Sequence, residues 1–284
     1  MYIGAICKKG SIQFFDVMDV KVSVIIPCYN HGIYIQEAIN SVLSQTIDNY
    51  EIIVVNDGST DQFTNEFLSK YTHPKVQIFK TRNKGVSHAR NFGIRRAKGK
   101  YILPLDADDK IGSEYLQLAS QYLDDHPEVG IVYCQAEYFG AISGFWELPE
   151  FSKELMPTQN LIFNSAMFRK SDWKRVGGYN EKMRYGYEDW DFWLSFIERG
   201  LLIHRIDQIL FYYRQHHVSS RNQEVMTNSV KLEKTLHTLK WNHKKLYNIT
   251  LRKQLKYYLQ KSCRFKPCYY FLHSCASIYR KFFR

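Results

Sequence analysis

Residues 101–109 read YILPLDADD, in which a short apolar run is followed by three carboxylates within four residues. The run 101–105 has the length and composition of a buried strand, so the acids are expected at its carboxyl end. Carboxylates this close repel one another unless a cation joins them. Hard divalent ions such as Mg²⁺ or Mn²⁺ prefer oxygen ligands and share them with substrate phosphates. The stretch therefore predicts either a metal site or a polar loop whose Asp caps a helix starting near Gly112.

Strand and helix patterns alternate around this stretch. The predicted strands are 22–27, 51–55, 76–79, 101–105 and 130–133. A first helix places Ile35, Ile39 and Val42 on one face, and another spans 87–97, with Gly99 as a left-handed stop. Such alternation predicts an α/β fold, with a mostly parallel central sheet covered by helices on both faces.

Polar residues follow three of the predicted strands. Asn30 comes after the first, Asp57 after the second and Asp106 after the fourth. In parallel sheets, ligands bind outside the carboxyl ends of the strands. We therefore expect these three side chains to share one ligand site.

The composition describes a globular chain, with 45% hydrophobic and 24% charged residues among 284. No apolar run reaches the roughly 18 residues that span a bilayer. Lys8 and Lys9 follow the first apolar stretch instead of preceding it, which is the wrong order for a signal peptide. The six cysteines show no CxxC pair and are expected to be reduced thiols. A cytoplasmic location follows as an expectation.

The net charge of +11 is concentrated in the C-terminal region. Residues 231–284 contain 14 Lys and Arg against one acid, a net +13, and residues 1–230 carry the remaining −2. Apolar residues recur at helical spacing there, and near the end they lie beside Arg280, Lys281 and Arg284: Phe271, Leu272, Cys275, Ile278, Tyr279 and Phe282. A basic amphipathic helix is typical of a segment lying on an anionic membrane surface. The alternatives are packing on the rest of the protein, an oligomer contact, or nucleic-acid binding.

Seven motifs occur in an order typical of one enzyme family. They are VIIPCYN (24–30), VNDGSTD (55–61), NKG with ARN (83–91), DADD (106–109), GGY (177–179), YEDWD (187–191) and YRQH (213–216). This order resembles the inverting family 2 glycosyltransferases, which have the Rossmann-like, nucleotide-sugar-binding GT-A fold. The resemblance implies a GT-A catalytic domain over 21–225, between an N-terminal extension (1–20) and a basic helical C-terminal region (226–284).

The resemblance also implies a nucleotide-sugar pocket. Its residues would be Pro27, Tyr29, Asn30, Asp57, Arg90, Asp106 and Ala107. Asp57 would accept a hydrogen bond from the uracil ring, a charge-assisted contact, although a bare Asp-Gly pair also suits a simple turn. Arg90 would hold the pyrophosphate or anchor Asp106, unless it lies on a solvated helix face.

A divalent metal, Mn²⁺ or Mg²⁺, is implied at Asp108 and His216. It would bridge the two phosphates and neutralise the departing nucleoside diphosphate. His216 could instead be a loop residue in contact with substrate or solvent. Asp109 is either part of this acidic site or a cap for the following helix.

The resemblance implies that the acidic pair Glu188-Asp189 lies where the acceptor binds. A sugar hydroxyl has a pKa far above 7, so it needs a carboxylate to take its proton as the new bond forms. Asp189 matches the base of the family, and attack opposite the leaving phosphate gives inversion. Glu188 would orient the acceptor, and Trp190 would stack on a sugar unless it belongs to the core. Asp191 is a rival base.

The function implied is transfer of a sugar, expected to be UDP-linked, to a hydroxyl of a saccharide or lipid-linked saccharide in surface polysaccharide synthesis. The expected location is the inner face of the plasma membrane, with no nucleic-acid partner, and an oligomer is possible. A rival enzyme is a sugar-phosphate nucleotidyltransferase, which would need a Gly-rich phosphate loop where this chain has Pro27-Cys28-Tyr29-Asn30. The non-enzymatic rival is a nucleic-acid-binding protein.

Overall fold

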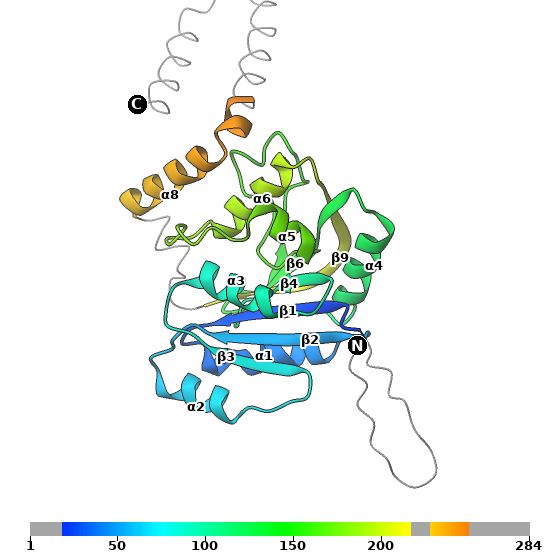
Figure 1. Ribbon diagram of the computed structural model, residues 1–284, viewed down its shortest axis with the longest axis vertical. Coiled ribbons are helices and arrows are strands. Elements are labelled where there is room, and N and C mark those ends of the chain that lie inside the picture. Colours follow the sequence, from blue (N-terminus) through cyan, green and yellow to red (C-terminus); the bar gives the residue numbers. More distant parts are fainter. Residues whose placement is uncertain (1–18, 217–227, 250–284) are drawn as a thin grey trace, which may run out of the picture.

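The structure, a computed structural model, describes residues 19–216 and 228–249, and in them one sheet of nine strands lies among seven named helices (Figure 1). The strands are β1 (Val22–Cys28), β2 (Tyr50–Asn56), β3 (Val76–Lys80), β4 (Tyr101–Pro104), β5 (Lys110–Ile111), β6 (Val129–Gly140), β7 (Gly144–Trp146), β8 (Met167–Arg169) and β9 (Leu202–Gln215). The helices are α1 (Gly32–Leu43), α2 (Gln62–Lys70), α3 (Val86–Arg96), α4 (Tyr115–Asp125), α5 (Lys170–Val176), α6 (Glu188–Glu198) and α8 (Ser229–Asn242).

The sheet has the order β3-β2-β1-β4-β8-β6-β9-β5, with β7 paired to β6. The pairs β3-β2, β2-β1 and β1-β4 are parallel, which confirms the predicted α/β fold. The chain moves outward from β1 to β3 and then returns to place β4 on the other side of β1. Because such crossovers are right-handed, α1 and α2 cover one face and α3 covers the opposite one. The crevice where this direction reverses is the expected ligand position.

Pro104 sets the point at which the acidic stretch leaves the sheet. Proline has no N–H for the ladder, but the next residue restores the pairing, since Leu105 N donates to the Ile25 carbonyl at 2.9 Å. Ile25, Leu103 and Leu105 are fully buried. Asp106 is therefore the first residue freed from the strand, at the carboxyl end of β4 beside that of β1.

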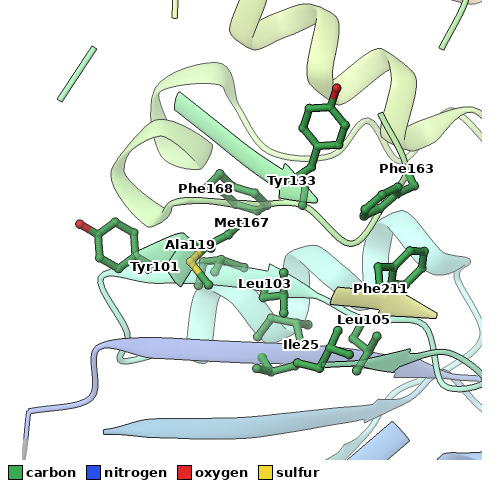
Figure 2. Close-up of a cluster of buried hydrophobic side chains, with 14 of the residues drawn as sticks. Ile25, Tyr101, Leu103, Leu105, Ala119, Tyr133, Phe163, Met167, Phe168 and Phe211 are labelled. Carbon is green, nitrogen blue, oxygen red and sulfur yellow. The ribbon is translucent and has the colours of Figure 1, made fainter. Parts of the chain in front are cut away.

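The core continues from the parallel strands into the antiparallel part of the sheet. Figure 2 shows Ile25, Leu103 and Leu105 beside Met167, Phe168 and Phe211, which come from β8 and β9. All of them are at most 2% exposed. One hydrophobic core thus joins the two parts of the sheet and fixes the strand ends relative to α6.

Gly99 has a different role from the predicted left-handed helix stop. Helix α3 ends at Arg96, and Gly99 does not have a positive φ. A Cβ on Gly99 would instead lie 2.6 Å from the backbone N of Ser23. Glycine is needed there because two backbones approach closely, which is its other common use.

Several elements have no counterpart in the sequence prediction. Strands β5, β7 and β8 have two or three residues, too few to show a period. β5 lies where a loop was expected to open a helix near Gly112, and α4 starts only at Tyr115. β9 pairs in parallel with β6 over most of its length and antiparallel with β5. It carries the YRQH motif back to the acidic stretch.

Helix α8 packs against the rest of the described chain beside α6, at the end of the molecule far from β3 (Figure 1). Leu239 is fully buried, and Thr235 and His243 are 4% and 3% exposed. Within the described ranges, none of the helices has the length and hydrophobicity to cross a membrane. The N-terminal extension to residue 18 and the predicted membrane face from Phe271 to Phe282 lie outside the described residues.

Candidate active site

Asn30 joins the loops that follow β1 and β2. It has a left-handed backbone, with φ 55°, a conformation that Asn tolerates better than most residues. Its Oδ1 accepts from the backbone N of Thr60 at 2.8 Å, and its Nδ2 donates to Thr60 Oγ1 at 3.0 Å. Its own backbone N donates to Ser59 Oγ. Tyr29 beside it is 42% exposed, so this part of the predicted nucleotide-sugar pocket is open to solvent.

Asp57 is buried at the end of β2 and is held by the loop after β3. Its Oδ1 accepts from Thr81 Oγ1 at 2.9 Å, and its Oδ2 accepts from the Gly85 backbone N at 2.8 Å. The backbone N of Lys84 lies 3.2 Å from Oδ1. These contacts explain why the NDG and NKG motifs occur together. The predicted contact with a uracil ring requires a ring N–H to share or replace one of these donors, and it stays a prediction.

Arg90 connects the two acidic motifs. Its Nη2 donates to Asp106 Oδ1 at 2.7 Å and its Nη1 to Glu188 Oε1 at 2.9 Å. The residue is 1% exposed, which excludes the solvated helix face, and the predicted anchoring of Asp106 is what the geometry shows. Burial lowers the pKa of Arg90, but Asp106 and Glu188 outweigh that effect and raise it overall. The guanidinium therefore stays charged between the two acidic motifs.

Asn91 attaches α3 to the turn that precedes the second acidic motif. Its Nδ2 donates to the Tyr179 carbonyl at 2.8 Å, and its Oδ1 accepts from the Tyr179 N at 2.9 Å. The same Oδ1 accepts from Trp173 Nε1. Gly178 has φ 78°, and a Cβ there would lie 2.8 Å from Asn91 Oδ1. The ARN and GGY motifs thus form one support, with Arg90 above the Tyr179 ring at 5.4 Å.

Asp108 and His216 lie close together, and their predicted role as metal ligands stays a prediction. His216 Nε2 lies 2.7 Å from Asp108 Oδ2, across 108 positions in the chain. His31, at the start of α1, adds an imidazole 3.7 Å from the other Asp108 oxygen. Within residues 19–216 and 228–249, no set of three or more His, Cys, Asp or Glu side chains is arranged to hold a metal ion. Asp108 and His216 could supply two ligands of a divalent ion, and substrate phosphates would supply further ligands.

Asp109 supports the acidic site and does not cap a helix. It is 2% exposed, and its Oδ1 accepts from the Arg214 backbone N at 2.9 Å. Arg214 Nε donates to the Asp108 carbonyl. Burial, then the nearby Asp108 and Asp106, raise the pKa of Asp109 well above its ordinary value. The predicted helix cap at Asp109 is therefore wrong, because β5 follows it and pairs with β9.

Asp189 is the partly exposed acid in the first turn of α6. Its Oδ2 accepts from Asn160 Nδ2 at 3.2 Å, and its Oδ1 accepts from the Trp190 backbone N at 2.7 Å. Burial and the neighbouring Glu188 raise the pKa of Asp189 to about 7, against the opposing effects of Arg90 and these hydrogen bonds. A carboxylate with this pKa has the basicity that general-base catalysis needs near neutral pH.

The other acids and the tryptophan of this turn face protein. Glu188 is 6% exposed and paired with Arg90. Asp191 is 5% exposed; its Oδ1 accepts from Asn242 Nδ2 at 2.7 Å and lies 3.4 Å from His243 Nε2. Asp191 therefore holds α8. Trp190 is 5% exposed and donates to the Met156 carbonyl, which places it in the core; its predicted acceptor contact, like that of Glu188, stays a prediction.

Two asparagines complete the site without any signal in the sequence. Asn160 contacts Asp189, and Asn164 Nδ2 donates to Asp106 Oδ1 at 3.3 Å. Both lie in an irregular segment before β8, for which the sequence shows no period. His31 and Asn91 are also missing from the predicted set, although each is adjacent to a predicted residue. A search for polar residues next to the motifs would have found these two but not the asparagines.

The family model for glycosyl transferase family 2 matches residues 23–183, and that for the N-terminal domain of galactosyltransferase matches 164–218. A chondroitin synthase of Pasteurella multocida is 30% identical over 239 residues, covering 82% of this chain and 23% of that protein. A hyaluronan synthase of the same species is 33% identical over 189 residues, covering 64% and 19%. The chain thus spans about a quarter or less of the length of these relatives.

Solved structures share the fold. The structure of S. aureus TarS 1–349 superposes with a TM-score of 0.59 at 25% identity, covering 68% of this chain and 60% of that one. TarS 1–349 in complex with UDP-GlcNAc gives a TM-score of 0.61 at 24% identity, covering 71% and 60%. The predicted GT-A fold is confirmed by this likeness.

Proposed function

The chain belongs to glycosyl transferase family 2, and from this premise we propose that it transfers a sugar from a UDP-sugar to a hydroxyl of a saccharide acceptor, with inversion. Membership favours this function over nucleotidyl transfer and over nucleic-acid binding. The observation that carries the proposal is the link Asp106–Arg90–Glu188, which places the base candidate Asp189 next to the strand-end acids. Donor and acceptor groups are thereby held in one rigid arrangement.

The donor would lie across the carboxyl ends of β1, β2 and β4. Tyr29, Asn30 and Asp57 bound the base and ribose end, and Asp106 bounds the ribose side. Pro27 and Ala107 place backbone at the two strand ends. A relative of the same fold was solved with UDP-GlcNAc, which supports a UDP-linked donor without fixing its sugar.

A divalent metal, Mn²⁺ or Mg²⁺, fits beside the diphosphate. Asp108 and His216 would hold it, since a carboxylate and an imidazole lie 2.7 Å apart at the strand end. Bound there, the ion would supply charge neutralisation for the departing nucleoside diphosphate. Arg214 would keep Asp108 in place, because its Nε donates to the Asp108 carbonyl and its backbone N donates to Asp109 Oδ1.

Asp189 would take the proton of the attacking hydroxyl. With its pKa raised to about 7, it is still partly ionised at neutral pH and is more basic than an ordinary carboxylate, so it accepts a proton more readily as the bond forms. Asn160 orients one carboxylate oxygen. Direct attack at the anomeric carbon, opposite the leaving phosphate, inverts its configuration. Glu188 would orient the acceptor indirectly through the first turn of α6.

The test is a donor screen that also separates the rival enzymes. Purified protein is incubated with nucleotide sugars and candidate acceptor glycans, with Mn²⁺ or with EDTA. The proposal expects metal-dependent release of UDP and a product of inverted anomeric configuration in the NMR spectrum. Release of pyrophosphate from UTP and a sugar 1-phosphate, without UDP release, would instead identify a nucleotidyltransferase.

The proposed setting is surface polysaccharide synthesis on a lipid-linked acceptor at the inner face of the plasma membrane. Support comes from the charge of +13 over residues 231–284, because each Lys or Arg near an anionic surface contributes about 1 kcal/mol of binding. Flotation with anionic and neutral liposomes tests it. Binding that ignores lipid charge and salt, or that survives deletion of 250–284, would contradict the membrane role.

A further inference from the structure

A groove of about 560 Å³ lies between the segment 182–185 and α8, outside the site described above. Met183 and Thr235, each 4% exposed, are its most buried lining residues. Tyr185 stands on one wall, 43% exposed, and Lys231 of α8 lies 6.0 Å from its ring centroid. The groove therefore depends on α8 being packed against the domain.

The charge of this groove is positive. Lys182 and Arg184 line one wall and Lys234 the other, against a single acid among the lining residues, Glu233. All three cations are exposed, and no ion pair joins them to a carboxylate within residues 19–216 and 228–249. Some exposed cations elsewhere do pair, as Lys100 does with Asp124 at 2.6 Å, and others such as Arg95 and Lys98 do not within the described residues, so it is the grouping of three cations around one groove that is distinctive. Cations on two facing walls without carboxylate partners favour an anionic ligand.

The groove is close to the catalytic base along the chain. Tyr185 precedes Asp189 by four residues, which span at most about 14 Å even when fully extended. A glycan whose reacting hydroxyl lies at Asp189 can therefore place a neighbouring unit beside the segment 182–185. The donor side lies at the strand ends, where Asp57 and Asp108 belong to other elements.

We propose that this groove, between segment 182–185 and α8, binds an anionic group, carboxylate or phosphate, of the acceptor glycan. The inference rests on the proposed function, since it assigns the acceptor of that same reaction. Lys182, Arg184 and Lys234 select a negatively charged acceptor, and α8 completes the acceptor site. Such contacts are solvent-exposed, so each contributes modestly and is weakened by salt.

The experiment compares probes that differ only in charge. One is a tetrasaccharide of alternating uronic acid and N-acetylhexosamine, and its control is the carboxyl-reduced tetrasaccharide. A phosphodiester-linked polyol oligomer, with the corresponding polyol without phosphate as its neutral control, distinguishes phosphate from carboxylate. Affinities are measured by titration calorimetry on the full chain at low and high salt. At least one anionic probe should bind about tenfold tighter than its control, and this preference should shrink at high salt.

Variants locate the binding. Lys182→Glu and Lys234→Glu should each weaken the anionic probe about fivefold, in line with exposed ion pairs. Lys245→Glu makes the same charge change on an exposed residue of the C-terminal region that does not line the groove, and it should have no effect. UDP affinity, measured in the same samples, shows whether the donor site is intact.

The outcomes separate this proposal from the function on which it rests. Failure of the wild type to bind any UDP-sugar contradicts the proposed function. UDP binding with equal affinity for charged and neutral probes, or no binding of either anionic probe, overturns the groove alone. The groove assignment is also overturned if Lys182→Glu and Lys234→Glu weaken binding to anionic vesicles but leave the affinity for the anionic probes unchanged.

Discussion

The donor half and the acceptor half of the site arrange their acids in opposite ways. Asp57 follows β2, whereas Asp106 and Asp108 lie in the one loop after β4, at the same edge of the parallel sheet. Glu188, Asp189 and Asp191 occupy one turn of α6, where about 100° of rotation per residue sends each toward a different neighbour. The proposed donor half concentrates negative charge for a cation to neutralise, whereas in the proposed acceptor half burial and the adjacent Glu188 raise the pKa of Asp189 to about 7.

The largest effect is expected from Asp189→Asn, which removes the proposed base and keeps its shape. The turnover number should fall by roughly 10²–10⁴-fold, the usual contribution of a general base, with UDP affinity unchanged. Asp191→Asn is the matched control, because it makes the same change two residues away on the side facing α8. Steady-state kinetics decide, and a larger loss in Asp191→Asn would reverse the assignment.

Breaking the connection between the halves should cost stability. Arg90→Met removes the buried cation that pairs with both Glu188 and Asp106. Removing one partner of a buried ion pair costs about 3–5 kcal/mol, to be measured as the free energy of unfolding in urea. Arg95→Met, at an exposed position of the same helix, should change it by less than about 0.5 kcal/mol. A similar small change in Arg90→Met would mean that the link is not a structural support.

The donor half should depend on metal. UDP at about 100 times its dissociation constant, with Mn²⁺, should raise the unfolding free energy of the wild type by about 2.7 kcal/mol. Asp108→Ala or EDTA should abolish most of this gain, whereas Asp125→Ala, an exposed acid of α4, should keep it. Equal stabilisation by UDP with and without metal would contradict a metal-dependent donor site.

The ratio kcat/KM should depend on pH through the ionisation of Asp189. Because the pKa of Asp189 is raised to about 7, the ionised base is lost as pH falls through that value. The ratio kcat/KM should reach a plateau above pH 8 and fall about tenfold per pH unit below 7. UDP affinity measured over the same range corrects for effects on the donor side. A profile that stays flat down to pH 5.5 would exclude this base.

The smallest effect concerns the attachment of α8. His243 is buried between Asp191 and Glu198; burial lowers its pKa, but the two acids outweigh this and raise it above 6.5. The stabilisation is therefore fully present below pH 6.5 and lost as pH rises through the raised value. His243→Gln should destabilise the protein by about 1 kcal/mol more at pH 6 than at pH 9, as urea unfolding at both pH values would show. An equal cost at both would mean that His243 is neutral throughout.

The same difference between the halves explains which site residues could be predicted from the sequence. Parallel strands bring their ends together by topology, so Asn30, Asp57 and Asp106 could be assigned to one site from strand order alone. Asp61, the last residue of the VNDGSTD motif, caps α2, since its Oδ1 accepts from the Thr64 backbone N. The acceptor half depends on which neighbour each side chain meets. The asparagines at 160 and 164 come from an irregular segment, and the distant α8 fixes Asp191, so neither could be read from a local pattern.

The parallel pairing of β9 with β6 affects the order in which parts of the site form during synthesis. β6 and β9 are parallel, so they can pair only after the whole crossover between them exists. His216, directly after β9, therefore reaches Asp108 late in synthesis, when the strand ends that bear Asp57 and Asp106 have long left the ribosome. A nascent chain stopped before β9 has Asp57 and Asp106 but lacks the imidazole of the proposed metal pair. Nucleotide affinity in the presence of metal would thus report whether the domain has been completed.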